Sequence, residues 1–152
     1  MPAIFEHHLT VTPEHIDRLG HVNNLEYLRW ALAAAIAHSA AQGWPTEAYE
    51  KLGAGFVVRS HEIKYLQSAF EGDEVVVRTW VSDFRRLSCM RRYKIIRRKD
   101  DVVLATAATE WAFVKFAGFS LARIPPEVAG AFEIVRDVEE SPRSRRGTEE
   151  KK

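Results

Sequence analysis

Residues 24 to 42, "NLEYLRWALAAAIAHSAAQ", carry the strongest signal for the fold. They are rich in leucine and alanine, which are strong helix formers, so they predict a helix. Asn23 or Asn24 can cap its start, and Gly43 followed by Pro45 ends it. Its polar residues lie near the two ends, whereas its middle is apolar all round. A helix without a polar stripe is normally buried, so we expect the rest of the chain to wrap around it.

The segments on both sides of this helix are typical of strands. Residues 3 to 12, "AIFEHHLTVT", alternate apolar and polar side chains with the period of a half-buried strand. Four segments after residue 55 are rich in valine, isoleucine and aromatic residues: "FVVRSHEIKYLQSA", "DEVVVRTWVSDF", "SCMRRYKIIRRK" and "VVLATAATEWAFVKF". Short connections favour antiparallel pairing of consecutive strands. The sequence therefore predicts an α+β fold, in which one five-stranded, mostly antiparallel sheet curls around one long central helix.

The chain of 152 residues fits a single domain, which we place at residues 1–136. Near its end, "ARIPPEVAGAF" (residues 122–132) predicts a short helix. Residues 137–152, "DVEESPRSRRGTEEKK", combine mixed charges with almost no apolar side chains, so we expect a disordered tail there.

Composition excludes several classes of function. Lysine and arginine (22) nearly balance aspartate and glutamate (21), so the net charge of +1 provides no general attraction to nucleic acid or to an anionic membrane. The single cysteine, Cys89, excludes an internal disulfide framework. The N-terminus "MPAIFEHHL" lacks the apolar run of a signal peptide, and no stretch is long enough to span a bilayer. We expect a soluble cytoplasmic protein that binds neither nucleic acid nor membrane.

A polar motif stands directly before the helix. Its pattern is D-x-x-G-H-V-N-N-x-x-Y-L-x-W, which begins at Asp17 and ends at Trp30. The motif resembles that of the hotdog-fold acyl-CoA thioesterases of the 4-hydroxybenzoyl-CoA thioesterase-like group, and the resemblance covers about residues 3–133. The H-V-N-N element is also similar to that of plant acyl-carrier-protein thioesterases, so coenzyme A or a carrier protein can carry the acyl group. Many relatives have a second aspartate two residues before the first, where this chain has His15.

The resemblance implies a reaction centre at the start of the helix. Asp17 would act as general base or nucleophile in thioester hydrolysis, and the backbone N–H of Asn24 would bind the oxyanion that develops. Such N–H groups at a helix N-terminus are unpaired and lie at the positive end of the helix dipole. Gly20 would allow a tight turn that brings the carboxylate toward the helix. His21 and Asn23 complete the set of candidate catalytic residues.

Each of these residues also has a structural interpretation. The asparagine side chains are expected to cap the helix, and Asp17 can be a turn residue. His21 can pack or cap as well as contact substrate. Tyr27 and Trp30 are one helical turn apart, a spacing typical of a core. A metal site at His15, Asp17 and His21 lacks any accompanying metal-ligand motif, so no metal or redox cofactor is expected.

A second group of candidate residues lies in "SDFRRLSC", residues 82–89. In the related thioesterases, basic residues at the matching positions hold the nucleotide phosphates of coenzyme A at a subunit edge. The resemblance assigns this role to Arg85 and Arg86, with Ser88 as a weaker donor, and arginine suits phosphate because its planar fork of donors matches phosphate oxygens. His61, on a strand face that covers the helix or lines a shared pocket, joins this group. Most of the basic run 91–98 is interpreted as the solvated face of a strand.

The resemblance thus implies an acyl-CoA or acyl-carrier-protein thioesterase with coenzyme A as part of the substrate. A hotdog domain that binds acyl thioesters without cleaving them, as a ligand sensor, is the alternative. Exposed edges of a curled sheet are normally covered or paired, and hotdog relatives pair two sheets into a dimer, often then a tetramer. We expect at least a homodimer. The acyl group, and the choice between general base and nucleophile, cannot be read from the sequence.

Overall fold

The computed structural model describes residues 3–136. The tail expected at residues 137–152 lies outside this range. Five strands form one sheet: β1 (Phe5–Thr10), β2 (Ala54–Tyr65), β3 (Glu74–Phe84), β4 (Ser88–Arg97) and β5 (Val102–Lys115). The strand order is β1-β3-β4-β5-β2, and every neighbouring pair is antiparallel. The predicted five-stranded antiparallel sheet is confirmed, and β1 and β2 are its two edges. The expected pairing of consecutive strands is right for β3–β4 and β4–β5 but wrong for β2, which crosses over to pair with β5, and for β1, which pairs with β3.

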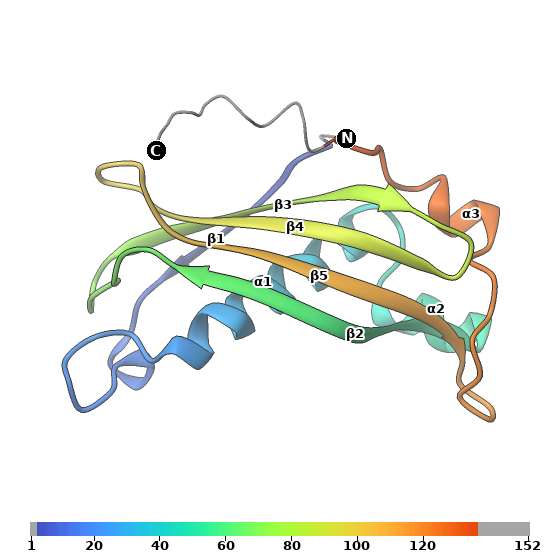
Figure 1. Ribbon diagram of the computed structural model, residues 1–152, viewed down its shortest axis with the longest axis horizontal. Coiled ribbons are helices and arrows are strands. Elements are labelled where there is room, and N and C mark those ends of the chain that lie inside the picture. Colours follow the sequence, from blue (N-terminus) through green and yellow to red (C-terminus); the bar gives the residue numbers. More distant parts are fainter. Residues whose placement is uncertain (1–2, 137–152) are drawn as a thin grey trace.

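Helix α1 (Asn24–Ala41) lies along one face of this sheet, which curls over it (Figure 1). The helix starts and ends within one residue of the predicted limits. Its buried residues include Ala31, Ala34 and Ala35, whose small side chains let the strands approach closely. Tyr27 and Trp30 are also buried, and the Tyr27 hydroxyl accepts a hydrogen bond of 2.9 Å from the backbone N–H of Ala69. Both aromatic residues therefore belong to the core, as their spacing predicted.

The outer side of α1 differs from the expectation that the helix is apolar because it is buried all round. Leu25 is 62% exposed and Ile36 is 57% exposed. Within one chain the sheet covers only one side of the helix, so the apolar residues of the other side remain in contact with solvent. Val58 and Tyr65 of the edge strand β2 are exposed apolar residues as well. A protein–protein interface would cover such side chains.

Three short helices complete the fold: η1 (Pro13–His15), α2 (Thr46–Leu52) and α3 (Pro126–Ala129). Helix α3 confirms the short helix expected in residues 122–132. The sequence analysis missed α2, which follows Pro45 and ends at Gly53 in the left-handed conformation, with φ of 79°. Both α2 and α3 lie at the end of the sheet opposite the start of α1 (Figure 1).

Candidate active site

A tight turn at residues 17–21 leads into α1. The Asp17 N–H donates to the His21 carbonyl at 2.8 Å, and the Gly20 N–H donates to the Asp17 carbonyl at 3.1 Å. Gly20 has φ of 82°, a left-handed conformation in which a Cβ atom is unfavourable. The turn that the glycine predicted is therefore present.

The carboxylate of Asp17 divides its two oxygens between different environments. Oδ1 accepts a hydrogen bond of 2.8 Å from the Leu19 N–H, and the His21 N–H approaches it at 3.4 Å. Oδ2 accepts no hydrogen bond from any residue in the range 3–136. One oxygen thus fixes the turn, as the structural interpretation of Asp17 requires, while the other is left for a ligand or a water molecule.

The start of α1 presents a backbone donor. Asn23 caps the helix, because its Oδ1 accepts from the Leu25 N–H at 2.9 Å and its carbonyl accepts from the Glu26 N–H at 2.9 Å. Asn24 is exposed, and its N–H has no acceptor among the described residues. The capping role expected for Asn23 is confirmed. The Asn24 N–H is the amide left free at the positive end of the helix dipole.

His15 and His21, on either side of Asp17, face neighbouring rings. His21 is exposed and packs edge-on against Phe70, with ring centroids 5.3 Å apart. His15 Nδ1 accepts from the Thr12 N–H at 3.0 Å, and its ring packs edge-on against Trp30. The hydrogen bond with Thr12 shows that His15 stabilises the η1 turn. Nowhere in residues 3–136 do three or more histidine, cysteine, aspartate or glutamate side chains gather closely enough to hold a metal ion.

The candidate phosphate-binding arginines occupy the turn between β3 and β4. Both side chains are exposed, and Arg85 Nε donates to Asp83 Oδ2 at 2.9 Å. The Arg86 carbonyl accepts from the Ile124 N–H at 2.9 Å, which anchors the turn. Ser88 is only 7% exposed, so its hydroxyl is poorly placed to reach a phosphate. Only the two arginines are retained for that role.

The start of α1, with the turn at Asp17, and the arginine turn between β3 and β4 lie at opposite ends of the sheet (Figure 1). The Tyr65 hydroxyl donates to the Asn24 carbonyl at 3.2 Å, and Tyr65 pairs with Ala105 on β5. Ser88, beside the arginine turn, pairs with Ala112, seven residues further along β5. The separation is about 23 Å at roughly 3.3 Å per residue. Within one chain, the turn at Asp17 and the arginine turn are thus far apart along the sheet.

His61 belongs to neither the turn at Asp17 nor the arginine turn. It is on the exposed edge strand β2, and its Nδ1 lies 2.9 Å from the Thr109 hydroxyl of β5. Burial lowers the pKa of His61 below the ordinary value for histidine. The residue faces the same side of the sheet as α1, in register with Thr109 and, beyond it, Arg91.

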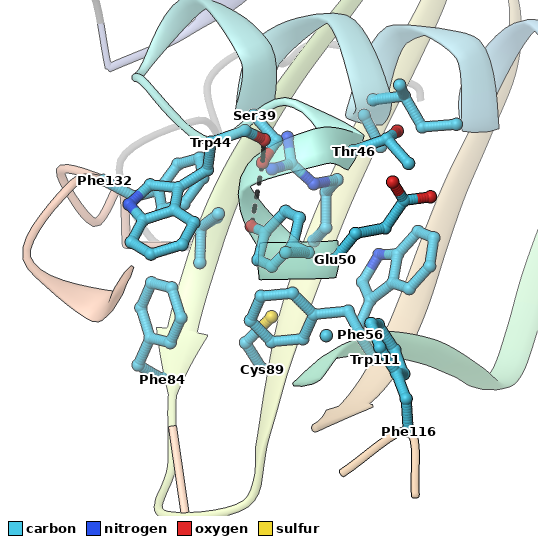
Figure 2. A pocket seen from close by; sticks show the side chains of 16 residues that line it. Ser39, Trp44, Thr46, Glu50, Phe56, Phe84, Cys89, Trp111, Phe116 and Phe132 are labelled. Carbon is cyan, nitrogen blue, oxygen red and sulfur yellow. Dashed lines mark hydrogen bonds between the residues drawn. The ribbon is translucent and has the colours of Figure 1, made fainter. Parts of the chain in front are cut away.

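A cavity of about 440 Å³ lies under the second half of α1 (Figure 2). Most of its lining is apolar and aromatic, and it comes from α1, α2 and strands β2 to β5 and from the segment around Phe132. Its volume falls in the range of small-molecule sites. Because α2 forms one wall, and α2 was missed, the sequence analysis could not foresee this cavity.

One charged residue of the cavity wall, Arg91, is buried, with only 5% of its surface exposed. The sequence analysis interpreted most of the basic run 91–98 as a solvated face, and this is wrong for Arg91. The side chain lies on the inner face of β4 together with Cys89 and Tyr93, and its Nη1 donates to His38 Nδ1 at 2.9 Å and to the Thr79 hydroxyl at 3.1 Å. Alternation along a strand does not say which face is inside.

The described groups that surround Arg91 are neutral, so they do not balance its positive charge. Burial, together with the nearby guanidinium, lowers the pKa of His38 to about 4, so this histidine is neutral at pH 7 and accepts the hydrogen bond. Burial raises the pKa of the Cys89 thiol to about 12, so the thiol is neutral as well. The positive charge of Arg91 is therefore held by neutral groups and by the face of Phe132, 5.8 Å from the guanidinium carbon.

A comparison with known protein families gives a match over most of the chain. The model of the thioesterase-like superfamily matches residues 11–132, most of the chain. The chain belongs to the thioesterase-like superfamily. The matched residues include the turn at Asp17, all of α1 and the arginine turn. The family identifies the chain as a thioester hydrolase by class. No curated protein sequence matches this thioesterase-like chain at a significant level.

Solved structures share the fold. A 1,4-dihydroxy-2-naphthoyl-CoA thioesterase from Synechocystis is 17% identical, with a TM-score of 0.78 over 84% of this chain and 94% of the other. A DHNA-CoA thioesterase from Staphylococcus aureus is 24% identical, with a TM-score of 0.78 over 84% and 87%. A hypothetical protein from Staphylococcus aureus in complex with CoA is 17% identical, with a TM-score of 0.79 over 84% and 80%. The hotdog fold of the thioesterase-like chain is thus confirmed.

None of the helices in residues 3–136 is both long and apolar enough to cross a membrane.

Proposed function

We propose that the protein hydrolyses acyl-CoA thioesters, or the equivalent acyl-carrier-protein thioesters, at the start of α1. The observation that supports this most directly is the free Asn24 N–H at the helix N-terminus, beside a turn that leaves Asp17 Oδ2 without a hydrogen bond. A developing oxyanion needs such a donor, and the attack on the thioester carbon needs such a carboxylate. The solved relatives named as CoA thioesterases agree with this class of substrate.

In the general-base form of the reaction, Asp17 takes a proton from water while the water oxygen attacks the thioester carbon. The carbonyl oxygen gains negative charge and accepts a hydrogen bond from the Asn24 N–H. When the tetrahedral intermediate collapses, the carbon–sulfur bond breaks, and the proton passes to the leaving thiolate. In the nucleophilic form, Asp17 itself attacks the thioester carbon, the carbon–sulfur bond breaks and the thiolate leaves. Water then hydrolyses the resulting anhydride, which restores the carboxylate and supplies the proton for the thiolate. Both forms use the same two groups.

We also propose that the complete site is formed between two chains. Edge strand β2 is exposed over most of its second half, and antiparallel pairing with the β2 of a second copy would cover it. Such pairing about the middle of β2 brings the Tyr65 end of one strand beside the Gly55 end of the other. The Asn24 N–H of one chain would then lie on the same side of the dimer as the arginine turn of its partner.

A dimer or larger assembly is therefore expected in solution. Pairing of β2 would also cover the apolar side chains of Val58 and Tyr65 and part of the outer side of α1. Light scattering at micromolar concentration should give at least twice the mass of the chain. A monomeric mass would contradict the shared site.

The arginine turn predicts a selective effect on substrate binding. Replacing both Arg85 and Arg86 with alanine should raise KM for acyl-CoA, because their guanidinium groups would no longer contact the nucleotide phosphates. Hydrolysis of an acyl-pantetheine thioester, which lacks the nucleotide, should change little. The difference should shrink as salt is added, because exposed charges are screened.

A double variant of two other exposed basic residues, Arg98 and Lys99 changed to alanine, is the matched control. It removes the same formal charge from the turn at the opposite end of β4. Equal losses on both substrates in the Arg85/Arg86 variant would show that the pair acts on the structure or on the chemistry instead.

The proposed activity itself is tested with a panel of acyl-CoA thioesters of different chain length and polarity, followed by release of free thiol. Turnover of at least one member is expected. Absence of turnover together with tight binding would favour the sensor alternative. The cytoplasmic location stays a prediction.

A further inference from the structure

The cavity under the second half of α1 combines an apolar lining with one buried cation. A buried charge is costly unless it is paired, and a charge that faces a cavity can be paired by a ligand. Arg91 is such a charge. We propose that this cavity binds the far end of an acyl group that carries a terminal carboxylate, with Arg91 as its partner. This inference rests on the proposed function, because it defines the substrates of that same site.

The free edge of the Arg91 guanidinium fits a carboxylate. Nη1 is used by His38 and Thr79, whereas Nε and Nη2 form no hydrogen bond with any residue in the described part of the chain. The Nε–Nη2 edge is the one that binds a carboxylate with two parallel hydrogen bonds. Arg97 shows this geometry on the same strand, since its Nε and Nη2 both donate to Asp100 at 3.1 to 3.2 Å.

No carboxylate of the described chain fills that role for Arg91. Asp83, which lies near Cys89, already pairs with Arg85 at 2.9 Å. Glu50 lines the cavity at an exposed position and forms no ion pair within residues 3–136. Tyr49 and Tyr93 remain neutral phenols, because burial raises the pKa of both. The negative charge that would balance Arg91 is therefore expected from a ligand.

The position of the cavity agrees with an acyl-binding role. Gly55 and Phe56, at the start of β2, form part of its wall. In the proposed dimer this end of β2 lies beside the Tyr65 and Asn24 of the partner chain. An acyl group held at the reaction centre of one chain would thus extend into the cavity of the other, along its apolar lining, until its terminal carboxylate meets Arg91. A plain aliphatic chain would leave the cation unpaired.

The test compares two ligands that differ only at the far end. Octanedioate and octanoate are both used as methyl esters at the near end, so that only octanedioate keeps a free carboxylate, and they are titrated into the full-length protein. Binding is followed by calorimetry and by tryptophan fluorescence, to which Trp44 and Trp111 in the cavity wall contribute. Hydrolysis of octanedioyl-CoA and octanoyl-CoA is measured in parallel. We expect octanedioate to bind more tightly than octanoate, and octanedioyl-CoA to have the higher kcat/KM.

Three variants separate charge, hydrogen-bond geometry and structure. Arg91→Met should weaken octanedioate binding by about 10- to 100-fold and raise KM for octanedioyl-CoA similarly, with a smaller change for octanoyl-CoA. Arg91→Lys, which keeps the charge but loses the two-donor edge, should fall between wild type and Arg91→Met. Arg98→Met, at an exposed residue directly after β4, should behave as wild type.

The outcomes distinguish this inference from the proposed function. The carboxylate site is overturned if the wild-type protein hydrolyses the two thioesters with equal kcat/KM and binds octanedioate no more tightly than octanoate. Thioester hydrolysis would still stand. A protein that hydrolyses neither thioester but binds octanedioate through Arg91 overturns the proposed function and supports the site. If Arg91→Met does not fold, the wild-type comparison and Arg91→Lys decide. Equal losses on both ligands in Arg91→Lys overturn the inference.

Discussion

Changing Asp17 to asparagine is expected to lower kcat by at least about 100-fold, because a general base typically contributes 10²- to 10⁴-fold and a nucleophile can contribute more. The substitution removes the negative charge and the basicity but keeps the size of the side chain. An amide oxygen can still accept the hydrogen bond from Leu19 N–H that fixes the turn. Folding should therefore be little affected, and affinity for acyl-CoA should change far less than kcat.

The measurement is free-thiol release at saturating acyl-CoA, with binding followed separately by calorimetry. Asp101→Asn is the matched control: Asp101 is an exposed turn residue with φ of 57°, a conformation that asparagine tolerates. It should keep the wild-type rate. If Asp17→Asn keeps most of that rate, Asp17 is only a turn residue and its catalytic assignment is wrong.

The second large effect is expected from proline at position 24, which tests a backbone group by mutation. Asn24 is the first residue of α1, a position where proline is favoured because its N–H is not needed by the helix. Asn23 has φ of −60° and ψ of 135°, a conformation that suits the residue before a proline. Asn24→Pro should therefore leave α1 intact while it removes the N–H proposed to bind the oxyanion.

Loss of one oxyanion donor typically lowers kcat by about 10²- to 10³-fold, and we expect a loss of this size in Asn24→Pro. Asn24→Ala, which deletes the side chain but keeps the N–H, should stay close to wild type. Far-UV circular dichroism and the thermal midpoint check that the helix is retained in both variants. An active proline variant would contradict the backbone donor, and equal losses in the two variants would assign the effect to the side chain instead.

The amino-acid sequence was enough to predict the elements that depend on local chemistry. The composition of residues 24–42 specified α1 almost to the residue, because helix propensity, an asparagine cap and a terminating glycine all act within one turn of each end. Gly20 likewise specified the turn at Asp17, because the left-handed conformation there is a local requirement. Alternating and β-branched segments specified five strands of an antiparallel sheet, but not the pairing of β1 with β3 or of β2 with β5.

Which groups meet across the fold depends on tertiary packing, and local sequence did not reveal it. Arg91 and Arg92 are adjacent and chemically identical, and nothing local tells which of them faces α1; the pairing of β4 with β3 and β5 places Arg91 inside. The cavity also depends on α2, whose seven residues are too few to produce a clear helical period. The separation of Asp17 from the arginine turn was equally invisible, because distance along the sheet depends on register. Burial and long-range pairing are properties of the whole chain, and they decided the chemistry around Arg91.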